Sequence, residues 1–96
     1  MMQPAVERLV QIGPLPSSSV AAAPGLQEVE ALLAKVQTPI TDDEARALVR
    51  LFGPDDCFGL AWSLLHLIET SPGWPIEDAL HGLHGEWIDR LRERAA

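Results

Sequence analysis

The segment from residue 55 to residue 70 limits the possible folds of this chain more than any other part of its sequence. Apolar residues cover nearly the whole circumference of the helix that this segment predicts, and they are Cys57, Phe58, Leu60, Ala61, Trp62, Leu64, Leu65, Leu67 and Ile68. Only a narrow stripe remains, formed by Gly59, Ser63, His66 and Thr70. A helix that is apolar on almost every side is covered by neighbouring elements on several sides. We therefore expect it to be the central helix of the fold.

Two helices are predicted before this central segment. Residues 26–36 place apolar side chains at helical spacing, which is typical of a helix with one buried face. Thr41 and Glu44 fit a capping box, in which each side chain binds the backbone amide of the other residue. The box predicts that a second helix runs over residues 41–52.

A further helix is predicted from Pro75 to the C-terminal end, and its apolar residues from Ile76 to Leu91 follow one another at steps of three and four. Gly82 and Gly85 weaken this helix by about 1 kcal/mol each relative to alanine. The predicted fold class is all-α, a small bundle of four short helices, or five with an N-terminal one. The side chains expected in its core are Leu48, Phe52, Trp62, Leu65, Ile68, Leu80, Leu83 and Trp87.

The first 25 residues differ in composition from the rest of the chain. Val6, Leu9 and Val10 form a short apolar face, which is compatible with a short helix or with a frayed arm. Residues 13–25 carry no charge and are rich in Pro, Ser and Ala, as in a linker. The predicted organisation is an N-terminal arm and linker over residues 1–25, followed by one compact helical domain over residues 26–96.

Charge and composition narrow the classes of function. The net charge is −7, and no Lys or Arg occurs between Leu51 and Pro75. This part of the sequence lacks the basic residues that bind nucleic acid or anionic lipid. We see no run of about 18 apolar residues that would span a membrane and no secretory signal. We expect a cytoplasmic protein that binds another protein with a basic surface, and neither nucleic acid nor membrane, while the oligomeric state stays open.

Histidines and carboxylates at helical spacing raise the question of a metal or acid–base site. His66 and Glu69 are three residues apart, as are Asp78 and His81, so each pair shares a helix face. A di-iron bundle requires a Glu-x-x-His pair from two helices and a carboxylate from each of two others, a set that this sequence does not complete. The nucleophile elbow Gly-x-Ser-x-Gly is also missing. We predict no catalytic residue, no metal, no cofactor and no enzymatic activity.

We expect structural roles for His66 and Cys57. We expect His66 to hydrogen-bond a backbone carbonyl or a carboxylate across the bundle, with contact to a partner as the alternative. Cys57 is the only cysteine of the chain, and we expect it to be a small buried side chain.

Acidic residues gather at the predicted helix starts, and in an up-down bundle alternate helices start at the same end. We predict a partner-binding surface at that end, formed by Asp42, Asp43, Glu44, Trp74, Glu77, Asp78 and His81. The alternative for the acidic residues is compensation of the helix dipoles alone. Trp74 either caps one end of the core or is an exposed anchor for a partner.

The stretch "ITDDEARALVRLFGPDDCFGLAWSLLHLIETSPGWP" carries a resemblance that covers roughly residues 38–75. It resembles small bacterial proteins that are similar to the immunity proteins of polymorphic toxin systems. The resemblance implies a small cytoplasmic protein that binds and neutralises a toxin domain. The alternatives are an accessory or regulatory subunit of a larger assembly and, with less support, a metal-dependent or acid–base enzyme.

Overall fold

The computed structural model describes residues 2–15, 23–53, 57 and 59–95. These residues form six α-helices and one short 3-10 turn, η1, with no strand among them. The elements are α1 (Pro4–Ile12), α2 (Ala23–Lys35), α3 (Asp42–Leu48), η1 (Val49–Leu51), α4 (Leu60–Ile68), α5 (Glu77–Leu80) and α6 (Glu86–Ala95). The predicted all-α fold class is confirmed. None of the described helices combines the length and the apolar character that a membrane span requires.

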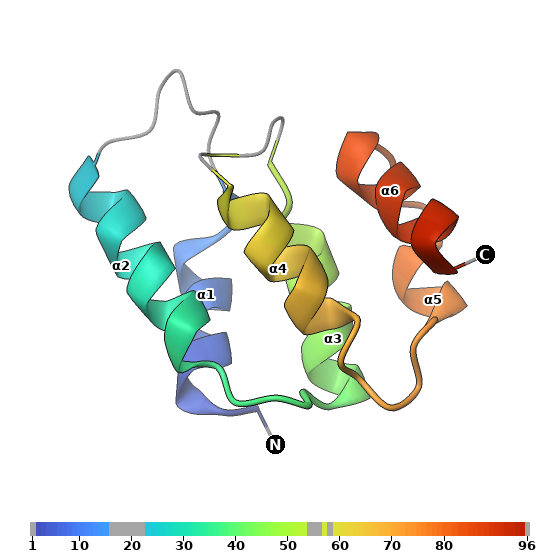
Figure 1. Cartoon of the computed structure of the whole chain (residues 1–96), viewed down its shortest axis with the longest axis horizontal. Helices are drawn as coiled ribbons and strands as arrows, with labels where there is room; N and C mark the ends of the chain where they lie inside the picture. The colour runs from blue at the N-terminus through green and yellow to red at the C-terminus, as the bar shows by residue number, and fades with distance from the viewer. Residues whose placement is uncertain (1, 16–22, 54–56, 58, 96) are drawn as a thin grey trace.

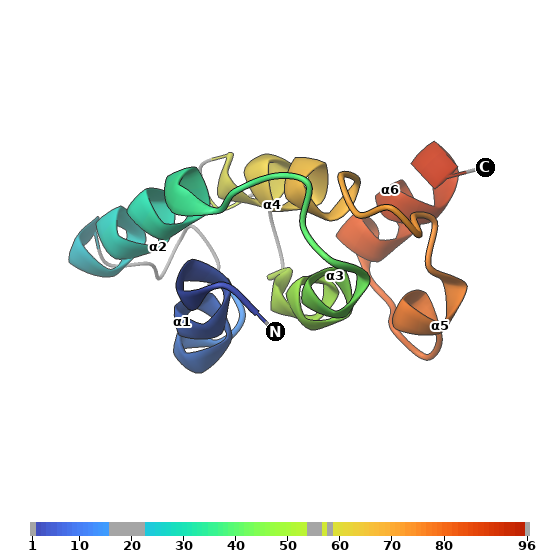
Figure 2. The same ribbon diagram turned by 90° about the horizontal axis from the view of Figure 1, so that it is seen from below.

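The helices pack in two layers. Figure 2 shows α2, α4 and α6 in one layer and α1, α3 and α5 in the other. Helix α1 packs on α2 and α3, and α4 packs on α2, α3 and α6. In Figure 1, α2, α4 and α6 run in one direction, whereas α1 and α3 run in the opposite direction. Helix α1 is therefore antiparallel to α2, and α3 is antiparallel to α4.

Helix α4 supplies the centre of the core, as predicted. Leu64, Leu65 and Ile68 are fully buried, together with Leu48 of α3 and Leu91 of α6. Among the predicted core residues, those that are buried are Leu48, Leu65, Ile68, Leu80 and Trp87. Two others, Phe52 and Leu83, are partly buried against this core. Cys57 is buried as well, as expected.

The prediction that Trp62 belongs to the buried core is wrong. Trp62 is 37% exposed, and its neighbour Ser63 is also exposed. The physical reason lies in the layered packing, because α2 and α6 flank α4 and α3 lies beneath it. No described helix lies over the outer side of α4, and Trp87 and Arg90 of α6 cover only part of Trp62.

The prediction of one continuous helix from Pro75 to the C-terminal end is also wrong. The structure instead has the short helix α5 and the longer helix α6, separated by residues 81–85. Gly82 has φ 77° and Gly85 has φ 125°. Glycine adopts positive φ without the steric penalty of a Cβ atom. The two glycines therefore end one helix and precede the next, where the sequence predicts only a weakened helix.

The N-terminal segment is part of the packed structure. Val6 and Leu9 of α1 are buried in the same core as α4. Gln3 and Gln37 exchange hydrogen bonds, since Gln37 N donates to Gln3 Oε1 over 2.8 Å and Gln3 Nε2 donates to the Gln37 carbonyl over 3.1 Å. Leu15 N donates to the Leu51 carbonyl over 2.8 Å. The packed region is therefore not confined to residues 26–96. Most of the predicted linker, residues 16–22, lies outside the described residues.

The capping box at the start of α3 is confirmed, and it extends to α1. Glu44 N donates to Thr41 Oγ1 over 3.1 Å, and Thr41 N donates to Glu44 Oε1 over 2.9 Å. The second carboxylate oxygen, Oε2, accepts from Gln3 N over 2.9 Å. Burial alone would raise the pKa of Glu44, but hydrogen bonds from the Thr41 and Gln3 amides outweigh it and lower the pKa. One carboxylate thus joins the start of α1 to the start of α3.

Replacing Glu44 by Gln is expected to lower the free energy of unfolding by about 1–3 kcal/mol. An amide has one acceptor oxygen, so either the Thr41 or the Gln3 amide loses its partner. Because the pKa of Glu44 is lowered on folding, the wild-type contribution is present above the ordinary Glu pKa of about 4.3 and is lost as the pH falls through the folded-state pKa. Urea unfolding of the wild type and the variant at pH 7 and pH 3 measures the two free energies of unfolding. The difference between the two proteins should shrink at the lower pH, and a constant difference would contradict the prediction.

Replacing Gly82 by Ala is expected to lower the free energy of unfolding by about 1–2 kcal/mol, because the residue has a positive φ. A Cβ atom there would meet no heavy atom within 4 Å, so backbone strain is the only cost. In a continuous helix the same change would stabilise the protein by about 1 kcal/mol. The sign of the change in the free energy of unfolding therefore distinguishes one continuous helix from two separate ones. Asn tolerates this conformation better, and Gly82→Asn serves as the control with a smaller loss.

Candidate functional site

Acidic side chains from α3 and α5 do meet at one end of the molecule. Arg46 lies between them, because its Nη1 is 2.8 Å from Asp43 Oδ1 and its Nε is 3.3 Å from Asp78 Oδ2. The charge of Asp78, assisted by the hydrogen bond to Asp43, raises the pKa of Arg46. The side chains of Asp43 and Asp78 are 79% and 72% exposed, so their carboxylates remain open to solvent. We call Asp42, Asp43 and Asp78 the acidic end.

Asp42 joins the acidic end to the turn that follows α4. Its Oδ1 accepts from Gly73 N over 2.8 Å. A Cβ atom on Gly73 would clash with the Asp42 carboxylate, so glycine permits this close approach. Trp74 follows directly and packs, partly buried, against the core. Of the two interpretations of Trp74, the contacts agree with capping of the core.

An open depression lies beside the acidic end. It has a volume of about 500 Å³, and its lining includes Asp42, Asp43 and Arg46 together with Pro39 and Pro72. Two of these lining residues carry carboxylates and one carries a guanidinium. A cationic side chain that enters the depression could therefore contact Asp43 while Arg46 keeps Asp78 as its partner.

The other predicted partner-binding residues differ from Asp43 and Asp78 in their exposure and contacts. Glu44 is 2% exposed and both of its carboxylate oxygens accept backbone amides, so its prediction as a contact residue is wrong. The local sequence signalled the capping box but not the long-range bond to Gln3. His81 is exposed in the turn after α5. The side chain of Glu77 lies outside the described part of the structure.

The pair formed by His66 and Glu69 is joined to α6 by Arg94. Glu69 binds Arg94 of α6 through two hydrogen bonds of 2.7 and 2.9 Å, and these chiefly lower its pKa. His66 Nδ1 is 3.5 Å from Glu69 Oε1, and its side chain is 62% exposed. The expectation that His66 reaches across the bundle is wrong, because it points outward and meets a carboxylate of its own helical segment. Within the described residues, no group of three or more His, Cys, Asp or Glu side chains could hold a metal ion.

An aromatic cluster joins α4, α6 and the residue after η1, and it reaches the surface at Trp62, which sequence reasoning missed. The Trp62 and Trp87 rings meet edge to face with centroids 5.0 Å apart, and Phe52 stacks on Trp87 at 5.9 Å. Arg90 places its Cζ 5.3 Å from the Trp62 centroid and 5.0 Å from that of Trp87. Both distances lie within the range of cation–π attraction. The spacing of Trp87 and Arg90, three residues apart on one helix, was the available signal.

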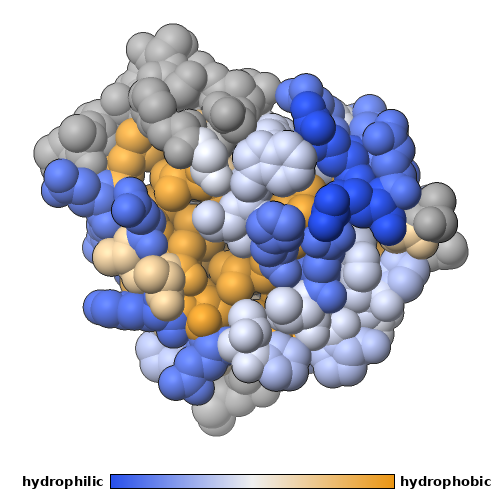
Figure 3. Space-filling model, viewed as in Figure 1, coloured by the Kyte–Doolittle hydropathy of each residue, from blue (hydrophilic) through white to orange (hydrophobic). Residues whose placement is uncertain are grey.

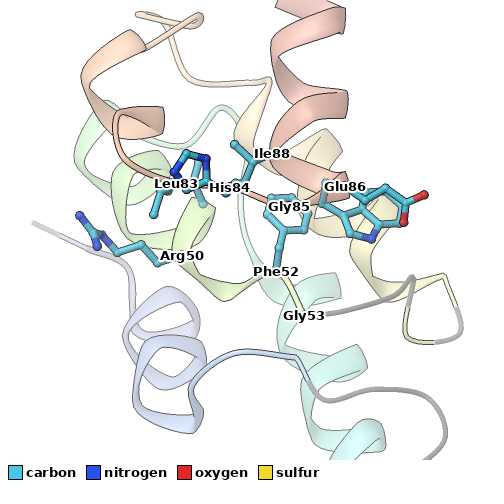
Figure 4. A pocket seen from close by; sticks show the side chains of 10 residues that line it. Arg50, Phe52, Gly53, Leu83, His84, Gly85, Glu86 and Ile88 are labelled. Carbon is cyan, nitrogen blue, oxygen red and sulfur yellow. The ribbon is translucent and has the colours of Figure 1, made fainter.

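A small pocket lies between η1 and the start of α6. Figure 4 shows Arg50 and His84 on one side of Phe52 and Glu86 on the other. The pocket has a volume of about 110 Å³, which is below the roughly 300–1,000 Å³ of typical small-molecule sites. An enclosed site for an organic substrate therefore has little support here.

Comparison of the chain with protein-family models, with curated proteins and with solved structures finds no significant match.

Replacing Trp62 by Ala is expected to lower the free energy of unfolding by less than the same change at Trp87, because Trp62 is 37% exposed; its aromatic pair and its cation–π contact add about 1–2 kcal/mol to the worth of its buried area. Trp87 is buried, so Trp87→Ala should cost about 3–5 kcal/mol. Urea unfolding of both variants gives the comparison. Equal losses would mean that Trp62 belongs to the core in solution.

Proposed function

We propose that the chain is a non-enzymatic, acidic protein-binding module, an immunity-type inhibitor that neutralises a toxin or an enzyme with a basic surface in the cytoplasm. The observation that carries the proposal is the convergence of exposed carboxylates from two helices, Asp43 of α3 and Asp78 of α5, on one end of the molecule. The net charge of −7 would also attract a basic partner over longer distances.

Electrostatic reasoning supports this role. Exposed carboxylates contribute little to stability, because solvent screens their ion pairs. The same charges attract a cationic surface during diffusion and accelerate association. Glu44 accepts two partly buried backbone amides and Glu69 binds Arg94, whereas Asp43 and Asp78 form only exposed ion pairs with Arg46. Asp43 and Asp78 are therefore available to a partner at little cost to the fold.

A second candidate is an accessory subunit of a larger assembly. The observation that favours it is the exposure of large apolar side chains, namely Val10, Ile12 and Trp62. A subunit of this kind would bury such side chains against its neighbours.

Reversing the charge at Asp43 and Asp78 together, as Asp43→Lys with Asp78→Lys, tests the inhibitor proposal. The tagged wild-type chain is used to recover its partner from the native host, and the partner is then purified. Its association rate with each variant is measured at several salt concentrations, and its own activity is assayed with and without the chain. We expect a basic partner, inhibition by the wild type, and association at least about tenfold slower with the double variant at low salt.

The matched control reverses Glu7 and Glu93 to Lys, which makes the same change in net charge. Both residues are exposed, and neither forms an ion pair within the described part of the chain. The control should slow association far less. If both double variants slowed association equally, the effect would come from net charge and not from the acidic end. A partner whose activity is unchanged by the wild-type chain would refute the inhibitor role.

A further inference from the structure

The outer surface of α2 and α4 contains an apolar groove that lies apart from the acidic end. Figure 3 shows apolar residues, in orange, as a strip between these two helices. The groove has a volume of about 210 Å³, and its described lining consists of Glu30, Leu33, Ala34, Leu60, Ser63 and Leu67. Leu33 and Leu60 are buried, Leu67 is partly buried, and Ala34 is exposed. The groove is thus an apolar floor with a small exposed side chain at its edge.

The position of the groove follows from the layered fold. Helices α2 and α4 lie side by side in the same layer and run in the same direction. On its other side, α4 packs on α6. No described helix lies on the outer side of the α2–α4 pair. Two neighbouring helices of this kind present a furrow in which the side chains of a third helix can pack.

The negative charge of Glu30 at the groove favours a positively charged partner. Glu30 is the charged residue among those that line it, and it has no ion-pair partner within the described residues. By contrast, Glu28 on the same helix binds Arg8 over 3.3 Å. A cation on the occupant would therefore find a carboxylate that no described side chain neutralises. A second copy of this chain would instead bring another charge of −7 and a second Glu30.

We propose that this groove binds an amphipathic helix of a basic partner protein. Apolar side chains of that helix, at positions i, i+3 or i+4, and i+7, pack on Leu33, Leu60 and Leu67. A Lys or Arg on its flank pairs with Glu30. The inference rests on the proposed function in assuming a protein partner, but it concerns a different face of the molecule and names the element that is recognised.

The test uses the full chain and a synthetic amphipathic helix of about 15 residues, with Leu on one face and Lys on the other. Titration followed by amide NMR spectra locates the binding surface and gives the dissociation constant. We expect shifts along the facing sides of α2 and α4, and weaker binding of a matched peptide with Glu in place of Lys. Glu30→Gln should weaken binding of the Lys peptide about two- to fivefold, as for one exposed ion pair.

Two alanines on α2 provide a matched pair of variants. Ala34 lines the groove, whereas Ala31 is exposed on the same helix and is not part of the lining. Ala34→Arg should weaken peptide binding at least about tenfold, because the larger side chain fills the groove. Ala31→Arg adds the same charge and should change the dissociation constant of the peptide less than about threefold. Both substitutions place a good helix former at an exposed position, so the fold should be retained.

Four results would overturn the inference. They are equal effects of the two arginine variants, shifts confined to α3 and α5, preference for the acidic peptide, and a dimer that buries the groove, which light scattering would detect. The double variant Asp43→Lys with Asp78→Lys separates this inference from the proposed function. It should leave the peptide's binding at the groove within about threefold of the wild type, while slowing association with the natural partner.

Discussion

Burial of α4 is the constraint on which the rest of the structure depends. Its residues Leu64, Leu65 and Ile68 are fully buried, and α2, α3 and α6 pack around it. Burying a Leu or Ile side chain contributes about 1.5–3 kcal/mol, a large fraction of the net stability of about 5–15 kcal/mol that small domains have. The ion pair between Glu69 and Arg94 then joins the end of α4 to α6. Helices that are too short to be stable alone are held in place by this shared core.

The two-layer arrangement around α4 decides which surfaces are open to partners. Helices α2, α4 and α6 lie in one layer, so their outer sides face away from the core. This leaves Trp62 partly exposed beside Arg90 and leaves an apolar groove between α2 and α4. A closed bundle would have buried these side chains. The same geometry brings the acidic starts of α3 and α5 together at one end, separate from the groove.

The two proposed contact surfaces have complementary physical roles. In the proposed function, exposed charges at the acidic end would act over distance and raise the rate of encounter. An apolar groove acts only in contact, and it slows dissociation by excluding water from the interface. A basic partner that presents an amphipathic helix would use both surfaces. Stability depends instead on carboxylates that are already engaged, chiefly Glu44.

Local sequence patterns determined the helical class, the capping box of Thr41 and Glu44, and core residues such as Leu48, Leu65 and Ile68, because these features depend on residues within one or two helical turns. The predicted gathering of Asp43 and Asp78 at one end also followed from helix order. Only the tertiary structure decided that Glu44 binds Gln3, that Trp62 lies on an open side, and that Gly82 and Gly85 separate two helices. Each of these outcomes depends on which distant segments pack together. Residue spacing shows that a helix has an apolar face, but the covering of that face is settled only when the core is assembled.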